Sequence, residues 1–198
     1  MTHYDHLGQQ PINEGGTFGS GRLVYSGYGD NYATSSLHLN PKRQAAPEEP
    51  FHAALWASDR TEDPNHVVHW EFENLEQLRT HPEPWHCAWL VWRYRDPDNF
   101  HYLILKSTGW EYGIRHPSGD GGQVFLATKE TPEFGFNGKH TVTVKSEGRR
   151  TTIHANGQLI HDRILNARLH NLVPPGGRVG AYSEDAHARF ERIESWSL

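Results

Sequence analysis

The sequence predicts an all-β protein, in which short strands and tight turns build a sandwich or a barrel. Apolar residues recur in short or alternating runs, with turn residues about every 8–12 positions. No window of about 11 residues carries apolar side chains at the i, i+3, i+4 and i+7 positions of an amphipathic helix. The chain combines a mean hydropathy of −0.76 with 7 Trp, 8 Tyr and 8 Phe. That composition fits sheets with one hidden face and one exposed face.

About a dozen segments satisfy the strand pattern. They are residues 22–25, 52–57, 66–73 (with an extension to 79), 87–94, 100–106, 110–115, 124–127, 140–145, 151–154, 158–164, 178–182 and 187–195. The Pro- and Glu-rich stretch 41–50 predicts a long surface loop. Since no low-complexity linker divides the chain, we expect one domain over residues 1–198.

Three of the turns have recognisable chemistry. Asn156 and Gly157 suit the two positive φ angles of a type I′ hairpin turn. Residues 96–99 (Asp-Pro-Asp-Asn) and 106–109 (Lys-Ser-Thr-Gly) separate aromatic-rich runs and also predict tight connections. We therefore expect three antiparallel hairpins around these turns.

The turn at 106–109 determines which side chains of its hairpin share a face. A four-residue closure pairs Leu105 with Trp110 and Leu103 with Tyr112, and these residues form an apolar set with Ile114. The opposite face then carries Tyr102, Ile104, Glu111, Gly113 and Arg115, with Lys106 at the turn. In the preceding strand the sequence leaves two alternatives: the core side is either Trp89, Val91 and Arg93 or Leu90, Trp92 and Tyr94.

Charge and cysteine content exclude several classes of protein. There are 19 Lys and Arg against 24 Asp and Glu, a formal net charge of −5, and no basic run. The sequence therefore predicts neither a nucleic-acid nor a membrane partner, and no segment approaches the ~18 apolar residues of a membrane span. Cys87 is the single cysteine, so an intrachain disulfide and a thiolate zinc site are excluded. The first residues show no signal-peptide pattern. We expect a cytoplasmic protein, or an extracellular one if a signal has been removed.

Three segments resemble a known superfamily. Residues 85–102 resemble a strand–loop–strand unit of laminin-G-like and concanavalin A-like sandwiches, with an aromatic strand ending in Arg-Tyr before an Asp/Asn turn. Residues 151–160 are similar to a late hairpin of these proteins, and 177–182 with 188–193 are similar to the closing strands. The resemblance covers roughly residues 50–198 and indicates the concanavalin A-like lectin/glucanase superfamily. Within it, the chain is nearest to the 3-keto-disaccharide hydrolase-like domain of unknown function. The resemblance implies a two-sheet antiparallel β-sandwich, a concanavalin A-like jelly roll.

A mixed aromatic and charged cluster is the main candidate binding site. Sugars stack their C–H faces on aromatic rings and form hydrogen bonds with planar charged groups. Related sandwiches hold glycans on a concave sheet face. The substrate-binding candidates are Trp92, Arg93, Tyr102, Lys106, Trp110, Glu111 and Arg115. In the alternative interpretation the tryptophans belong to the core and the charges to a solvated surface.

Catalysis is a second hypothesis. Residues 71–76 (Glu-Phe-Glu-Asn-Leu-Glu) resemble the signature of family 16 glycoside hydrolases, with Glu73 in place of its middle Asp and without its usual Trp/Pro context. The resemblance implies Glu71 as nucleophile and Glu76 as acid/base in a retaining hydrolysis. A polysaccharide lyase would instead need a base such as His101 or Tyr102, with Arg93 or Lys106 neutralising a sugar carboxylate.

Calcium is a further expectation. Jelly-roll sandwiches often hold a structural Ca²⁺ where N-terminal loops meet a late strand, and Ca²⁺ prefers oxygen ligands. The candidate ligands are Asp30, Asn31, Glu184 and Asp185. No other cofactor is expected. The leading prediction is thus a module that binds an oligo- or polysaccharide, with a glycosidase, a polysaccharide lyase or a ligand-free interaction module as the alternatives.

Overall fold

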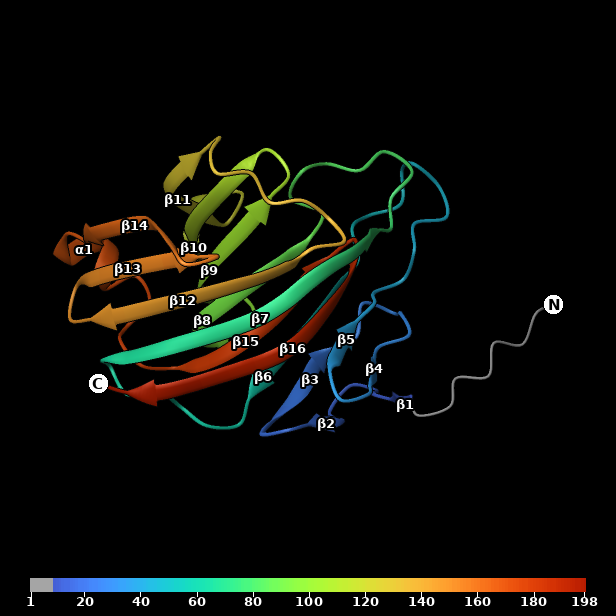
Figure 1. Ribbon diagram of the computed structural model, residues 1–198, viewed down its shortest axis with the longest axis horizontal. Coiled ribbons are helices and arrows are strands. Elements are labelled where there is room, and N and C mark those ends of the chain that lie inside the picture. Colours follow the sequence, from blue (N-terminus) through green and yellow to red (C-terminus); the bar gives the residue numbers. More distant parts are fainter. Residues whose placement is uncertain (1–8) are drawn as a thin grey trace.

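The computed structural model describes residues 9–198 and shows two antiparallel sheets stacked face to face (Figure 1). In spatial order, sheet A contains β1 (Gln10–Pro11), β4 (Tyr32–Ala33), β5 (Leu37–Leu39), β16 (Ala186–Ser197), β7 (His66–Gln77), β12 (Lys139–Glu147), β13 (Arg150–Ala155) and β14 (Gln158–Ile164). Sheet B contains β11 (Gln123–Lys129), β10 (Gly109–Asp120), β9 (Asn99–Lys106), β8 (Ala88–Asp96), β15 (Arg178–Glu184), β6 (Ala53–Ser58), β3 (Gly21–Tyr25) and β2 (Thr17–Phe18). The predicted all-β sandwich is confirmed.

The strands that the sequence did not predict are the shortest ones. β1, β2, β4 and β5 have two or three residues each, which is too few for a period of two to show in a sequence. One turn of helix, α1 (Ala167–His170), follows β14, and the Asn166 side chain caps it by accepting a hydrogen bond from the Leu169 amide (2.9 Å). Within the described residues no helix is long and apolar enough to cross a bilayer.

The predicted hairpin register around residues 106–109 is confirmed. Leu105 pairs with Trp110, and Leu103 pairs with Tyr112. These four side chains point between the sheets and pack with residues of sheet A such as Trp70. The turn at Asn156 and Gly157, with φ of 49° and 78°, also has the predicted positive φ angles.

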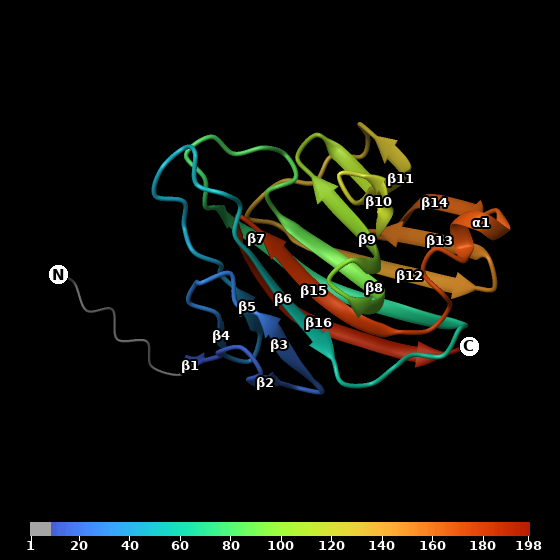
Figure 2. The same cartoon turned by 180° about the vertical axis from the view of Figure 1, so that it is seen from behind.

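Sheet B carries a second apolar cluster on its outer face, the face turned away from sheet A. It consists of Leu55, Ala57, Cys87, Trp89, Val91, Tyr94, Phe100, Tyr102, Ile104 and Tyr182. All of these side chains are buried, and Val24, Tyr25, Ala53 and Phe136 pack against the cluster. Two loops, 40–52 and 78–87, lie together at one end of sheet B (Figure 2).

The two alternatives for strand β8 are both partly right. Leu90 and Trp92 point into the core, whereas Trp89 and Val91 point outward. The alternation is interrupted at Arg93, which has a φ of 53° within a β-bulge. The bulge leaves Arg93 buried among interior polar residues and returns Tyr94 to the outer cluster.

Candidate carbohydrate-binding groove

The outer face of sheet B is hollowed in two adjoining places. The larger cavity, of about 580 Å³, is lined by Glu14, Tyr25, Gly27, Tyr28, Phe51, His52, Ala53, Trp89, Pro97, Asp98, Phe100, Arg115, Gly121, Gln123, Tyr182 and Glu184. The smaller, of about 400 Å³, is lined by Trp85, Trp89, Ile104, Lys106, Glu111, Gln123, Phe125 and Glu184. Because they share Trp89, Gln123 and Glu184, we treat them as one site, the sheet B groove. Its size is typical of small-molecule sites.

Aromatic rings form the floor of the groove. Strand pairing places Tyr182, Trp89, Ile104 and Glu111 in one row across β15, β8, β9 and β10. The Trp89 ring packs 5.0 Å from Tyr182 and 4.9 Å from Tyr102, measured between ring centroids. The Trp89 indole N–H donates to the Trp85 carbonyl (3.1 Å), which fixes the orientation of the ring. Protein contacts alone therefore hold the Trp89 ring in place.

Exposed aromatic side chains surround this floor. Among residues 9–198, the exposed large aromatic residues are Tyr28, Phe51, Trp85, Phe125 and Trp196. The first four line the groove, and Trp196 lies away from it. Exposed rings concentrated around one hollow are the usual mark of a binding surface, because water solvates them poorly.

The polar groups of the groove occupy two sides of Trp89. On one side, the Tyr182 hydroxyl donates to Glu184 Oε2 (2.6 Å). Burial raises the pKa of Glu184 to about 7, and the neighbouring Asp185 adds to the shift. The Glu184 carboxyl therefore holds its proton to a higher pH than an ordinary glutamic acid does, and in its protonated form it can donate as well as accept a hydrogen bond.

On the other side, Lys106 and Glu111 form an ion pair (3.3 Å) whose side chains are only 11% and 13% exposed. The Tyr102 hydroxyl donates to Gln123 (2.7 Å) and approaches Glu111 (3.2 Å). Tyr102 reaches these partners by crossing β10 over Gly113, where a Cβ atom would lie 2.3 Å from the hydroxyl. The network holds charged and amide groups at fixed positions beside the aromatic floor.

The structure separates the predicted sugar-binding residues into three groups. Lys106, Glu111 and Arg115 line the groove. Tyr102 lies beneath the groove on the same face but is fully covered. The expectation that Trp92 and Trp110 face a ligand is wrong, because both indoles belong to the core between the sheets. The prediction that Arg93 contacts a ligand is also wrong, because the bulge buries Arg93 in the interior.

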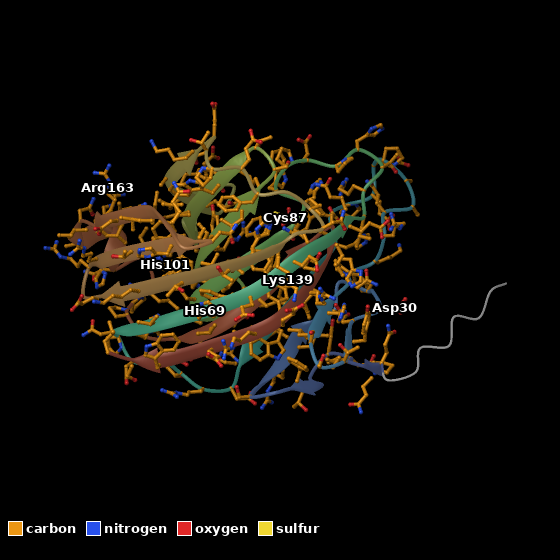
Figure 3. The ribbon with its side chains drawn as sticks, in the orientation of Figure 1. Asp30, His69, Cys87, His101, Lys139 and Arg163 are labelled. Atoms are coloured by element: carbon orange, nitrogen blue, oxygen red, sulfur yellow. The ribbon has the colours of Figure 1, made fainter. Side chains whose placement is uncertain are left out.

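The catalytic candidates do not come together. Glu71 and Glu76 lie on β7 of sheet A, the sheet that does not carry the groove, and they form ion pairs with Arg192 and Arg43. His101 lies within the body of the molecule, fully buried between the sheets (Figure 3). Burial raises the pKa of the Tyr102 hydroxyl, which opposes a role as a base. The structure therefore contradicts the predicted roles of Glu71 as nucleophile and Glu76 as acid/base. It also contradicts His101 or Tyr102 as the base of a lyase.

The four calcium candidates do not form a calcium site. Asp185 is buried and binds Arg79 (2.8 Å) and the His52 amide (2.8 Å). The Asn31 side chain bonds to backbone groups, and Glu184 points into the groove. Asp30 is exposed at the periphery (Figure 3). In the part of the chain from residue 9 onward, no three His, Cys, Asp or Glu side chains are arranged to hold a metal ion.

Sequence reasoning missed most of the groove. Trp89 and Tyr182 could have been found, because the register places Trp89 on the face of Tyr102. Glu184 was considered only as a metal ligand. Tyr28, Phe51, Trp85 and Phe125 come from loops and an edge strand, where no sequence period indicates which side chains converge.

The fold is that of the concanavalin A-like jelly rolls, as comparison with solved structures shows. Similar structures include the carbohydrate-binding module CBM66 from Bacillus subtilis (TM-score 0.63, 14% identity, 96% of both chains covered). The exoplasmic/lumenal domain of VIP36 in its Ca²⁺/Man2-bound form also matches (TM-score 0.62, 14% identity, 99% of this chain and 90% of that one). The carbohydrate recognition domain of Emp46p matches with a TM-score of 0.58, 8% identity, and 89% and 88% coverage. No family model and no curated protein sequence matches the chain.

VIP36 matches this chain to the same extent with and without its metal. The TM-score is 0.60 for the Ca²⁺-bound form and 0.61 for the metal-free form.

Proposed function

We propose that this protein binds a carbohydrate, an oligo- or polysaccharide segment, in the sheet B groove. The observation that carries the proposal is the ring of exposed aromatic residues Tyr28, Phe51, Trp85 and Phe125 around a hollow that also holds fixed polar groups. The names of CBM66 and the Emp46p domain, and the Man2-bound form of VIP36, support sugar as the ligand class on this fold.

The groove offers both kinds of contact that sugars need. Exposed rings at Trp85 and Phe125 can stack on the C–H faces of pyranose units, and each such contact removes apolar surface from water. Glu184, Glu111 and Arg115 present hydrogen-bonding groups between the rings. Because acidic and basic groups are both present, the groove suits a neutral sugar better than a highly charged one.

A pair of tryptophans with almost equal exposure provides the test. Trp85, 43% exposed, lines the groove, whereas Trp196, 45% exposed, lies on a different surface. A glycan array first identifies a ligand, and isothermal titration calorimetry then measures Kd. Trp85→Ala and Phe125→Ala should each weaken binding about 3–10-fold, while Trp196→Ala leaves Kd unchanged. No glycan bound above background by the unmodified chain, or equal losses at Trp85 and Trp196, would refute the proposal.

One observation also favours a second function, the cleavage of a glycosidic bond. Glu184 and Glu111 line the same cavity in different environments: burial raises the pKa of Glu184 to about 7, and Lys106 pairs with Glu111. Two carboxyl groups separated in this way are suited to acid and base roles. Release of reducing ends or unsaturated products from a panel of neutral and uronic-acid polysaccharides tests this function. Activity that Glu184→Gln abolishes supports it, and no product from any polymer excludes it in favour of binding alone.

A further inference from the structure

One end of the interior, between the sheets, is polar. On the inner face of sheet A, neighbouring strands place His66, Ser146 and Thr151 side by side. From sheet B, His101 and Tyr112 face them: His101 Nδ1 lies 3.0 Å from the Tyr112 hydroxyl, which approaches Thr151 Oγ1 (3.4 Å). All five residues are at most 2% exposed. This cluster is distinct from the sheet B groove, because it lies on the other side of sheet B.

Arg93 brings a full positive charge into this region. It is the only arginine among residues 9–198 that is buried, with 2% exposure. Its nearest acceptors are His170 Nδ1 and the Gly148 carbonyl, both at 3.5 Å, and its Nε–H has no acceptor. No Asp or Glu of the described chain forms an ion pair with it. A guanidinium stays protonated in proteins, so the charge persists.

Further polar atoms in the same interior lack protein partners. Trp92 Nε1, His66 Nε2, His101 Nε2 and Ser146 Oγ are all buried without a hydrogen bond. Burial lowers the pKa values of His66 and His101, and Arg93 lowers them further. These imidazoles are therefore neutral and do not add charge. Natural interiors rarely leave several polar groups unpaired around a charge, since each costs about 1–3 kcal/mol.

We propose that Arg93 binds a small monovalent anion, with chloride as the physiological candidate, inside the sandwich beside His66, His101 and Trp92. The charge selects an anion over water, because water solvates a guanidinium but does not neutralise it. Trp92 Nε1–H and Arg93 Nε–H are donors without acceptors, and they would complete the anion's coordination. Arg93, His66, His101 and Trp92 are each at most 2% exposed, so the ligand must be small enough to lie inside the sandwich.

Thermal unfolding of the full chain tests the proposal in solution. Tm is measured at constant ionic strength while chloride replaces gluconate, which is too large to enter. For the unmodified chain we expect Tm to rise by about 3–5 °C for each tenfold increase in chloride above Kd. Arg93→Met should remove this dependence, whereas Arg95→Met, two residues away at an exposed position, should keep it.

A crystallographic experiment covers the case in which Arg93→Met does not fold. Crystals of the unmodified chain are grown in bromide and measured at the bromine edge. An anomalous peak within hydrogen-bond distance of the Arg93 guanidinium supports the proposal. Ordered water alone at this position, or a Tm that does not depend on chloride, overturns it.

Discussion

The two outer faces of the sandwich differ in one acidic residue: in the described part of the chain, the sheet B groove holds Glu184 without a counter-charge, beside the paired Glu111. On sheet A, acidic residues pair with cations across strands: Glu71 with Arg192 (3.2 Å), Glu73 with Arg189 (2.5 Å) and Glu191 with Lys139 (2.7 Å). On sheet B, Glu184 is sheltered among Tyr182, Trp89 and Tyr25, and in residues 9–198 it has no ion-pair partner. Acidic residues alone therefore do not mark a site; shelter from water without a counter-charge is the more informative feature.

The largest expected effect concerns the floor of the groove. Because the outer face of sheet B is a second core, Trp89→Ala should lower the free energy of unfolding by about 3–5 kcal/mol. Trp85→Ala, on the rim of the same groove, should lower the free energy of unfolding by less than about 1 kcal/mol. Urea denaturation monitored by circular dichroism measures both values. Similar small losses for the two variants would show that this face is an ordinary surface, and Trp89→Phe provides an intermediate case if Trp89→Ala does not fold.

The sandwich fold could be predicted from the sequence because the residue patterns that specify its strands and turns are local. Turn residues such as Asn156 and Gly157 determine hairpins, and one turn length gave the register that separates Leu103 and Leu105 from Tyr102 and Ile104. The jelly-roll resemblance was carried by residues 85–102 and the closing strands, and comparison with solved structures confirmed it. Local pattern and turn chemistry agree with the final fold along most of the chain.

The site was predicted only in part, since it depends on features that local patterns do not encode. Lys106 and Glu111 were placed through the hairpin register. Arg93 was misplaced because a bulge interrupts the alternation, and no residue type in that strand signals a bulge. Trp92 was misassigned because a Trp on either face of β8 fits the same pattern when both faces of sheet B are buried, whereas the hairpin register had already placed Trp110 with the apolar set. The rim comes from loops whose approach is a tertiary property.

A substitution at Glu184 tests the difference between the two faces, because this residue should make the stability of the protein depend on pH. Burial raises the folded-state pKa of Glu184 to about 7 from its ordinary value of 4.5. The folded protein therefore holds this proton more tightly than the unfolded chain, and stability is lost as pH rises from 4.5 to 7. Glu184→Gln keeps an acceptor for Tyr182 without the charge. It should be more stable than the unmodified chain by about 2–3 kcal/mol at pH 8, with little difference at pH 4.5.

Chemical denaturation at a series of pH values measures this effect. The control is Glu71→Gln on sheet A, which removes an exposed ion pair with Arg192. A difference between Glu184→Gln and the unmodified chain that stays constant from pH 4.5 to 8 would contradict the interpretation of Glu184 as a sheltered, titrating carboxyl.

The smallest effect is expected on the outer face of sheet A. Glu71→Gln and Glu76→Gln each remove one partner of an exposed ion pair, and such pairs contribute about 0–1 kcal/mol. The free energy of unfolding of both variants should lie within about 0.5 kcal/mol of that of the unmodified chain. Both should bind the glycan with unchanged Kd. Denaturation and calorimetry on the double variant make the test stringent, because two independent sites should still add to less than about 1 kcal/mol.

A loss of glycan binding or of glycosidase activity in either variant would move the site to sheet A and restore the hydrolase-like interpretation of residues 71–76. Unchanged binding in both, together with losses at Trp85 and Phe125, would mean that ligand contact depends on which outer face carries a residue and not on its charge.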